Sequence, residues 1–393
     1  MSKFWTTGDD DNSSSDASSN EIQTYSRYGN KLDETDPSAA LGDDYLSENP
    51  NEAWQKIEDS QIFRDPLQST TTAKPPDCTR IVCISDTHGR HRQVHLPAGD
   101  ILIHGGDFTN SGEVGSIKDL SKYFEESGFQ EIVCIAGNHD MTLDPDYYAQ
   151  KWTRFHRKQF DCREAKASLQ HCVYLNDSSY TTKQGNIEFY GSPWSPEFFG
   201  WAFNAIRGGP IRNIWEQIPP STDVLITHGP PLGRGDLTAC NGYAGCYDLL
   251  LAVQKRIQPR LHVFGHIHEA AGTSFDGQTL FVNASSLDIK YQPVNHPIVI
   301  DIPHDVSQPA RVVPPNCQVN ANELAEWCIE NGYKTIGDLL LHSDEIPSGN
   351  DLLQHEEAYD ILVEHLFTRG FREAHRELPI MLSSLHAQSF PKT

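Results

Sequence analysis

Between residues 78 and 305, short runs of apolar and β-branched residues alternate with segments in which apolar residues recur at helical spacing. The runs are four to six residues long, the length of a buried strand. Helices are predicted at 113–128, 147–160 and 248–257. Strands and helices in alternation are typical of an α/β fold with parallel strands. The predicted strands are 80–85, 100–104, 131–136, 187–190, 223–227, 261–264, 279–282 and 297–302.

Residues 1–77 have a different composition. They are rich in Ser, Asp, Glu, Asn and Thr, with Gly and Pro, which is typical of a disordered acidic arm. Apolar residues at Trp54, Ile57, Ile62 and Phe63 fit a short docking helix, but the composition favours a solvated arm. We therefore expect the arm to end at residue 77 and the folded domain, 78–305, to follow it.

A third part begins after residue 305. Residues 322–333 and 351–367 carry amphipathic patterns that predict helices. No constellation of chemically reactive side chains occurs there. We expect residues 306–393 to form a helical C-terminal extension. Either extension is open to a protein partner.

The charge of the chain excludes some partners. With 393 residues and a formal net charge of -23, it lacks the basic surface that duplex nucleic acid or an anionic membrane would need. An acidic chain still binds a small anion when bound cations invert the local field. The sequence has no apolar leader, no segment apolar enough to span a bilayer and no C-x-x-C pair among its nine Cys. We expect a cytoplasmic protein without structural disulfides.

Side chains of metal-binding types follow five of the predicted strands. In an α/β fold, ligands bind outside the carboxyl ends of the strands, so these segments are expected to meet at one edge. The segments contain Asp86 and His88, Asp107, Asn138 with His139 and Asp140, His228, and His266 with His268.

The donor atoms in these segments are oxygen and nitrogen, with no thiolate. Such a set suits hard or borderline divalent ions, Mn²⁺ first, with Mg²⁺, Fe and Zn²⁺ also compatible. Without His139 and Asp140, the segments supply seven ligands. Seven are too many for one tetrahedral site, but they fit two adjacent ions that share a carboxylate. Asp107, which follows two glycines, is the natural bridge. This arrangement points to hydrolysis of a phosphate ester.

His139 is expected to have a different role. It is adjacent to Asn138, so in a tight turn its ring points elsewhere and is free to donate a proton. Asp140 is expected to hold its other ring nitrogen.

These segments, in this order, resemble the calcineurin-like metallophosphoesterase superfamily. The sequence is most similar to the metallophosphoesterase-domain-containing subfamily, near the class III cyclic nucleotide phosphodiesterases, over residues 80–303. The resemblance implies a four-layer α/β/β/α sandwich with the site at the edge of its sheets. It also implies a first ion on Asp86, His88, Asp107 and His268, and a second on Asp107, Asn138, His228 and His266, with His139 as proton donor oriented by Asp140.

Two positions refine what the resemblance implies. Some relatives carry Gly where this chain has His266, and weaker binding of the second ion is expected in them; His266 therefore favours a complete site here. Protein Ser/Thr phosphatases follow the Gly-Asp motif with Asp-Arg-Gly, which supplies an Arg to the phosphate. Here Phe108 and Thr109 follow Asp107, which is against that class.

An aromatic stretch after the predicted strand 187–190 offers substrate contacts. Trp194 and Trp201, with Asn204, are candidates for stacking on or bonding to a nucleobase, although packing of the rings in the core is the favoured interpretation.

We therefore predict a metal-dependent phosphodiesterase that hydrolyses small phosphodiesters or nucleotides, cyclic nucleotides among them, through a hydroxide that bridges two ions. Two alternatives stay open: a weakly active nucleotide-binding regulatory or scaffold protein, and a metal-dependent phosphomonoesterase.

Overall fold

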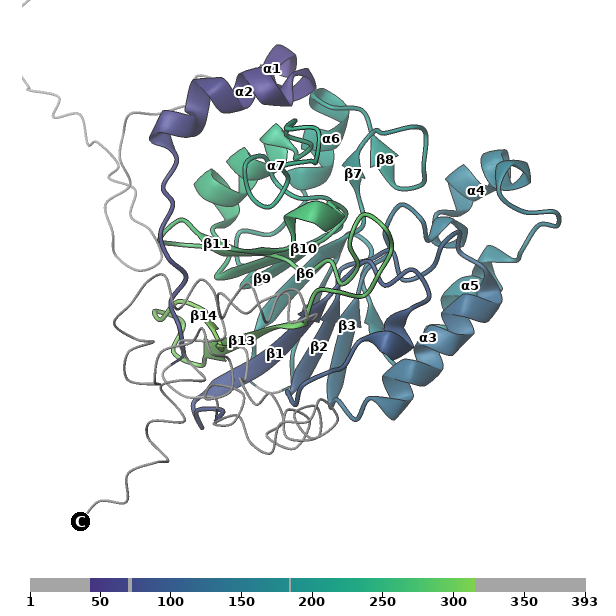
Figure 1. Cartoon of the computed structure of the whole chain (residues 1–393), viewed down its shortest axis with the longest axis horizontal. Helices are drawn as coiled ribbons and strands as arrows, with labels where there is room; N and C mark the ends of the chain where they lie inside the picture. Colours follow the sequence, from purple (N-terminus) through teal and green to yellow (C-terminus); the bar gives the residue numbers. More distant parts are fainter. Residues whose placement is uncertain (1–42, 70–72, 184, 315–393) are drawn as a thin grey trace, which may run out of the picture.

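The computed structural model describes residues 43–69, 73–183 and 185–314, and two six-stranded sheets form its centre (Figure 1). In the first sheet, β1 to β4 are parallel and β13 and β14 are antiparallel additions. Its order is β14 (Arg311–Val312), β13 (Ile298–Pro303), β1 (Cys78–Ile84), β2 (Ile101–His104), β3 (Glu131–Cys134) and β4 (Val173–Tyr174).

The second sheet has four parallel strands between two antiparallel edge strands. Its order is β11 (Gly272–Phe275), β12 (Leu280–Asn283), β10 (Leu261–Phe264), β9 (Val224–Thr227), β6 (Glu188–Ser192) and β5 (Ser178–Thr181). A separate short pair consists of β7 (Ser195–Pro196) and β8 (Asn204–Ala205).

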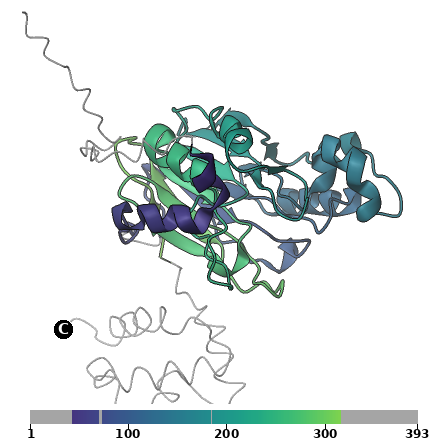
Figure 2. The ribbon, with the colours of Figure 1, turned by 90° about the horizontal axis from the view of Figure 1, so that it is seen from above.

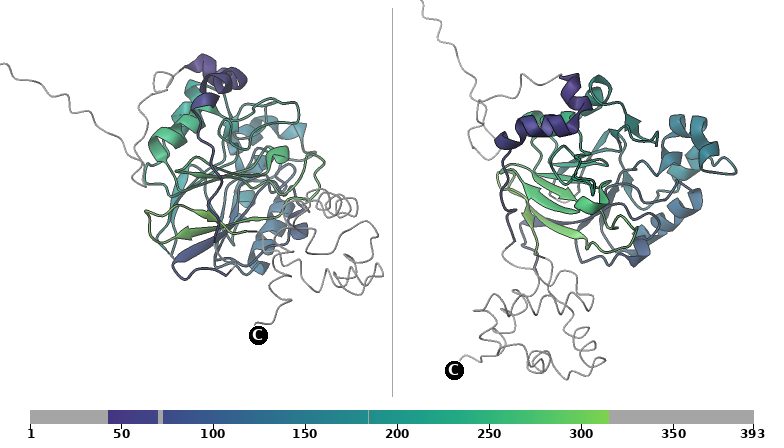
Figure 3. Two further views of the ribbon diagram at one scale, coloured as in Figure 1. Left: turned by 60° about the vertical axis from the view of Figure 1, so that its left-hand side comes forward. Right: turned by 45° about the horizontal axis from the view of Figure 1, so that its top comes forward.

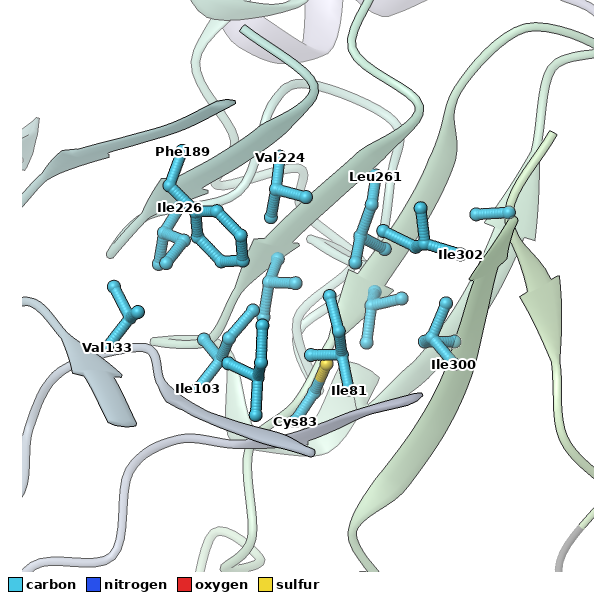
Figure 4. Packing of buried hydrophobic residues seen from close by; sticks show 14 of the residues in the cluster. Ile81, Cys83, Ile103, Val133, Phe189, Val224, Ile226, Leu261, Ile300 and Ile302 are labelled. Atoms are coloured by element: carbon cyan, nitrogen blue, oxygen red, sulfur yellow. The ribbon is translucent and has the colours of Figure 1, made fainter. Parts of the chain in front are cut away.

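The main core lies between the two sheets. Ile81 and Cys83 of β1 and Ile103 of β2 meet Ile226 of β9 and Leu261 of β10 there (Figure 4). All five side chains are at most 1% exposed. The alternate residues of each strand face outward, so the central strands are covered on both faces and are mostly apolar in sequence.

Helices cover the outer face of each sheet. On the first sheet, outward-facing residues of β1 to β3 pack against α3 (Val114–Glu126), α4 (Pro145–Lys151) and α5 (Cys162–Ala167). On the second, α6 (Gly209–Trp215) and α7 (Tyr247–Ala252) cover β6, β9, β10 and β12. The predicted four-layer α/β/β/α sandwich is therefore confirmed, with all eight predicted strands present.

The predicted helices are present but shorter. The first corresponds to α3, the second to α4 followed by a 3₁₀ turn at Trp152–Arg154, and the third to α7 followed by a π-helical turn at Val253–Ile257. The sequence did not reveal α5, α6 or the short edge strands, because these are brief and partly polar.

The prediction of a solvated arm over residues 1–77 is wrong for its described part. α1 (Asp44–Glu48) and α2 (Pro50–Ile57) pack on α7, as Figure 2 and the right-hand view of Figure 3 show for the purple helices. Trp54 is 6% exposed, and its ring lies against Gly233, where a Cβ would come within 1.8 Å of it. Residues 1–42 and 70–72 lie outside the described residues.

Polar contacts hold α1 in place. Ser47 is fully buried; its hydroxyl donates to Asp248 of α7 and accepts from the backbone N–H of Gly208. Arg212 of α6 donates to Asp248 at 2.8 Å and to Asp44 at 2.8 Å. Buried polar groups with satisfied hydrogen bonds, such as Ser47 and Asp248, are typical of a folded domain. This segment is therefore part of the folded unit.

The chain between α2 and β1 continues along both sheets. The backbone N–H of Arg64 donates to the carbonyl of Phe275 in β11, and that of Ser69 donates to Val312 in β14, each at 2.8 Å.

The folded domain extends beyond the boundary predicted at residue 305, because β14 belongs to the first sheet. The predicted helices at 322–333 and 351–367 lie outside the described residues. Within the described part of the chain, no helix combines the length and the apolar character needed to cross a bilayer.

The docked helices predict a stability effect. Replacing Trp54 with Ala should lower the free energy of unfolding by about 3–5 kcal/mol, because a large buried ring is lost and a cavity remains over Gly233. Urea unfolding of the full chain measures this. Tyr45→Ala is the matched control: this ring is 55% exposed on α1, so its removal should change stability by less than about 0.5 kcal/mol. A loss of stability for Trp54→Ala as small as that for Tyr45→Ala would show that α2 does not contribute to the fold.

Candidate metal centre

The five segments with metal-binding side chains meet where parallel strands of both sheets end. Asp86 and His88 follow β1, Asp107 follows β2, and residues 138–140 follow β3; residue 228 follows β9, and residues 266–268 follow β10. Because β1, β2 and β3 run parallel in the first sheet, and β9 and β10 in the second, the carboxyl ends of these strands lie at one edge. The seven predicted ligands therefore come from both sheets.

Four of these residues have a left-handed backbone. The φ angles are 53° at Asp86, 42° at His88, 53° at Asp107 and 70° at His266. Non-glycine residues in this region cost roughly 1–2 kcal/mol each. Hydrogen bonds hold the turns: the N–H of Asp86 donates to Gly106 at 2.9 Å, and that of His88 donates to the carbonyl of Asp107 at 3.0 Å. Such strain is typical of functional sites.

The Asp86 carboxylate joins the two sheets. Its oxygens accept hydrogen bonds from the backbone N–H of His266, at 3.0 Å, and from the Ser285 hydroxyl, also at 3.0 Å. His268 Nε2 lies 3.5 Å from Asp86 Oδ1. Asp86, His88 and His268 form one group whose potential ligand atoms lie within 4.8 Å of one another.

The Asp107 carboxylate lies between two further groups. One contains His88 and His139, and the other contains His228 and His266. Asp107 Oδ1 accepts the backbone N–H of His139 at 2.7 Å, and Oδ2 lies 3.3 Å from His228 Nε2 and 3.7 Å from His88 Nε2. One carboxylate therefore faces imidazoles from β1 and β9.

The third oxygen ligand predicted from the sequence, Asn138, also reaches this centre. Asn138 Oδ1 lies 2.9 Å from His228 Nε2, and His266 Nδ1 lies 3.2 Å from the same nitrogen. The structure thus brings all seven predicted ligands together.

His88 tests whether the site fits a cation. Both of its ring nitrogens are buried and have no hydrogen-bond partner, and a buried polar group without a partner costs about 1–3 kcal/mol. Burial lowers the pKa of His88 to about 4 and, together with the charge of His228, that of His266 to about 3. Neutral imidazole is the form that binds a metal, so these residues fit divalent ions.

The remaining charges at the centre balance one another. Burial opposes ionisation of Asp86 and Asp107, but the neighbouring histidines, His268 and His228 above all, lower the pKa of both carboxyl groups below the usual value. Burial likewise favours neutral His228 and His268. Contact with Asp107 nevertheless raises the pKa of His228 to about 9, and the hydrogen bond with Asp86 raises that of His268 to about 9.

Backbone carbonyls orient the imidazoles of His228 and His268, and no residue pattern predicts these contacts. His228 Nδ1 lies 3.0 Å from the carbonyl oxygen of Gly105, and His268 Nδ1 lies 3.1 Å from that of Asp288. Each contact leaves Nε2 directed at the carboxylates. Sequence reasoning also missed Tyr291, whose ring centroid is 5.4 Å from that of His268.

The prediction that Asp140 holds the ring of His139 is wrong. His139 Nδ1 lies 2.9 Å from the carbonyl oxygen of Asn110 instead. Asp140 is fully buried and accepts hydrogen bonds from the backbone of Gly137 and from the backbone and hydroxyl of Thr109. Burial, followed by the charge of Asp107, raises the pKa of Asp140 to about 7. Asp140 therefore joins two loops rather than orienting the imidazole.

The three predicted substrate contacts have different surroundings. Trp194 is fixed by a hydrogen bond from Nε1 to Asp177 at 2.8 Å and packs partly into the core. The amide of Asn204 bonds within its own loop. Trp201 stacks on His139, with ring centroids 4.1 Å apart and planes 29° apart. Trp194 and Asn204 thus stabilise the loop, whereas Trp201 contacts His139 beside the candidate metal centre.

Comparisons with known proteins agree with this fold and this centre. A family model described as calcineurin-like phosphoesterase matches residues 79–270. Metallophosphoesterase domain-containing protein 1 of Homo sapiens is 44% identical over 241 residues, which cover 58% of this chain and 73% of the human protein. A UPF0046 protein of Caenorhabditis elegans is 35% identical over 268 residues, covering 66% of this chain and 94% of the worm protein.

The chain belongs to the calcineurin-like phosphoesterase family. Membership supports metal-dependent hydrolysis of phosphoesters as its class of reaction, and the His and Asp groups described above are the candidate sites of the divalent ions.

The strained backbone at His266 predicts different effects of two substitutions. His266→Gly and His266→Ala both remove the imidazole, but only Gly adopts a φ of 70° without strain. In the presence of a chelator, the Gly variant should be more stable than the Ala variant by up to about 1 kcal/mol, which is the relief of strain less the greater entropy of unfolded Gly. Urea unfolding of both variants measures the difference. An Ala variant as stable as the Gly variant would mean that the turn is relaxed.

The raised pKa values predict that metal binding releases protons. His228 and His268, with pKa values of about 9, are protonated at pH 7.5 without metal and must be neutral to bind one. Metal affinity should therefore rise with pH up to about 9, with up to about two protons released per chain at pH 7.5. Calorimetric titration with Mn²⁺ in buffers of different ionisation enthalpy counts these protons. His268→Gln should release about one proton fewer, and a heat independent of buffer would contradict the assignment.

Proposed function

We propose that this chain is a dinuclear metal-dependent phosphodiesterase that hydrolyses small phosphodiesters, cyclic nucleotides among them. The observation that supports this most directly is the position of Asp107, which belongs to two groups of potential ligands at once. A shared carboxylate is the usual link between paired cations in enzymes that hydrolyse phosphate esters.

The ligands divide into two sets in this proposal. Asp86, His88, Asp107 and His268 would hold one ion, and Asp107, Asn138, His228 and His266 the other. Oxygen and nitrogen donors favour Mn²⁺ and also suit Mg²⁺, Fe and Zn²⁺. When bound, such ions supply Lewis acidity: they lower the pKa of water and neutralise charge on phosphate oxygens.

His139 is the proton donor in this proposal. It is partly exposed, its ring lies near that of His88, with centroids 4.8 Å apart, and its Nδ1 is occupied by the Asn110 carbonyl. Nε2 is therefore the nitrogen that can reach the departing alkoxide. Proton donation of this kind typically contributes ~10²–10⁴-fold in rate.

The charges around the centre support a diester over a monoester. The groups that act most strongly on the pKa values of Asp86 and Asp107 are His and Asp residues of the centre itself. A monoester dianion gains from a guanidinium clamp, whereas a diester carries one negative charge and depends on it less. The residues after Asp107, Phe108 and Thr109, supply no Arg. A phosphomonoesterase remains the alternative for the same centre.

Substitution of His139 tests the proposal. With Mn²⁺, the wild-type chain should hydrolyse bis-p-nitrophenyl phosphate and a cyclic nucleotide, and chelation should abolish both activities. His139→Ala should lower kcat for the cyclic nucleotide by ~10²–10⁴-fold, because an alkoxide needs a proton to leave. The loss should be much smaller for the p-nitrophenyl ester, because p-nitrophenolate is a weak base.

Elemental analysis of the same variant distinguishes the other roles. Loss of metal in His139→Ala would make this residue a ligand, since it also belongs to a group with His88 and Asp107. A wild-type chain that binds nucleotides without turnover above the chelated control would favour the regulatory or scaffold alternative. Preference for p-nitrophenyl phosphate would favour a monoesterase. A cytoplasmic location and a protein partner for the extensions stay predictions from the sequence.

A further inference from the structure

The imidazole of His139 is held by contacts from three separate loops. The carbonyl oxygen of Asn110 lies 2.9 Å from Nδ1. The ring of His88 meets it edge-on, with centroids 4.8 Å apart and planes at 86°. The indole of Trp201 lies nearly flat on it at 4.1 Å and 29°. The hydrogen bond leaves the ring free to turn about the Nδ1···O axis, whereas a flat stack fixes its plane.

Trp201 is itself held in place. The ring of Phe155 lies 5.1 Å from it, and the guanidinium carbon of Arg154 lies 5.8 Å from its centroid. Arg154 also donates to the backbone carbonyls of Phe199 and Gly200, at 3.1 and 3.2 Å. The residue directly before Trp201 is therefore attached to the segment after α4, and the indole has a defined position.

A second anchor comes from α4 and its N-cap. The hydroxyl of Tyr147 donates to the carbonyl of Gly200 at 2.8 Å, and the backbone N–H of Phe203 donates to the carboxylate of Asp144 at 2.9 Å. The backbone is thus tied on both sides of Trp201. Nothing in the chemistry of metal binding requires this support, because Trp201 has no ligand atom for the ions.

We propose that Trp201 is a positioning residue that acts through His139. Its indole sets the plane of the imidazole so that Nε2 faces the leaving oxygen of the substrate. This inference rests on the proposed function, in which His139 donates the proton. Preorganised donors accelerate reactions because no ordering is left for the reactive step, and a displacement of about 1 Å can cost ~10²-fold in rate.

The same contacts argue against Trp201 as a stacking platform for a nucleobase. Its ring already packs against His139 and Phe155 and lies under Arg154. A base would have to displace one of these groups in order to stack. The role predicted from the sequence, a direct substrate contact, and the positioning role therefore make opposite predictions for KM and kcat.

The experiment compares Trp201→Ala, Trp201→Phe and Phe199→Ala with the wild-type chain, all loaded with Mn²⁺. Trp201→Ala should lower kcat for a cyclic nucleotide by about 10- to 100-fold with KM unchanged. The loss on bis-p-nitrophenyl phosphate should stay within about twofold, because its leaving group needs no proton. Trp201→Phe keeps an aromatic face and should recover most of the rate. Phe199, 72% exposed on the same loop, is the control and should behave as wild type.

A double-mutant cycle separates action through His139 from an independent effect. In the His139→Ala background, Trp201→Ala should reduce turnover of the cyclic nucleotide by no more than about twofold, because the group that it positions is gone. An undiminished loss in that background would overturn the inference, as would a raised KM with unchanged kcat. If Trp201→Ala does not fold, the same cycle with Trp201→Leu decides.

Failure of the proposed function has its own signature. If His139→Ala alone leaves turnover of the cyclic nucleotide intact, His139 is not the donor, and both proposals fall together. If His139→Ala removes the activity while Trp201→Ala does not, the function stands and only the positioning role is wrong.

Discussion

The site depends on one carboxylate that faces loops from both sheets. Asp107, at the end of β2, bonds the loop after β3 through one oxygen and lies within 3.7 Å of imidazoles from β1 and β9 through the other. Asp86 makes a second connection between the sheets through the backbone N–H of His266. The centre therefore exists only when the two sheets are packed together, and the apolar core between them is a condition for its chemistry.

The backbone at these residues is held away from its preferred conformation. Asp86, His88, Asp107 and His266 all have positive φ angles, although each has a Cβ. Together they would cost several kcal/mol in an isolated peptide. The packed sheets impose the turns, and in return the side chains converge where cations can bind. The strained turns thus lower the stability of the fold but preform the arrangement of ligands, as is common at functional sites.

Much of this could be predicted from the sequence, for identifiable reasons. The central strands are covered on both faces, so residues such as 81–84 and 224–226 form continuous apolar runs. The ligands were found because Asp, Asn and His follow those runs directly. Backbone carbonyls have no sequence signal, so the contact of Asn110 with His139 and that of Asp288 with His268 required the structure. The edge strand β5, which alternates half-buried and exposed residues, was missed for lack of an apolar run.

The N-terminal segment shows that the family boundary is not the boundary of the folding unit. The matched region begins at residue 79, yet Arg234 inside it is fully buried beneath Phe63 and donates to Gln61 and the carbonyl of Ile62. The region matched by the family model also ends at residue 270, before β13, which pairs with β1. Recombinant protein trimmed to residues 79–270 would expose the unpaired guanidinium of Arg234, the open edge of β1 and the apolar surface of α7 to water. Such a fragment is expected to be expressed as insoluble inclusion bodies.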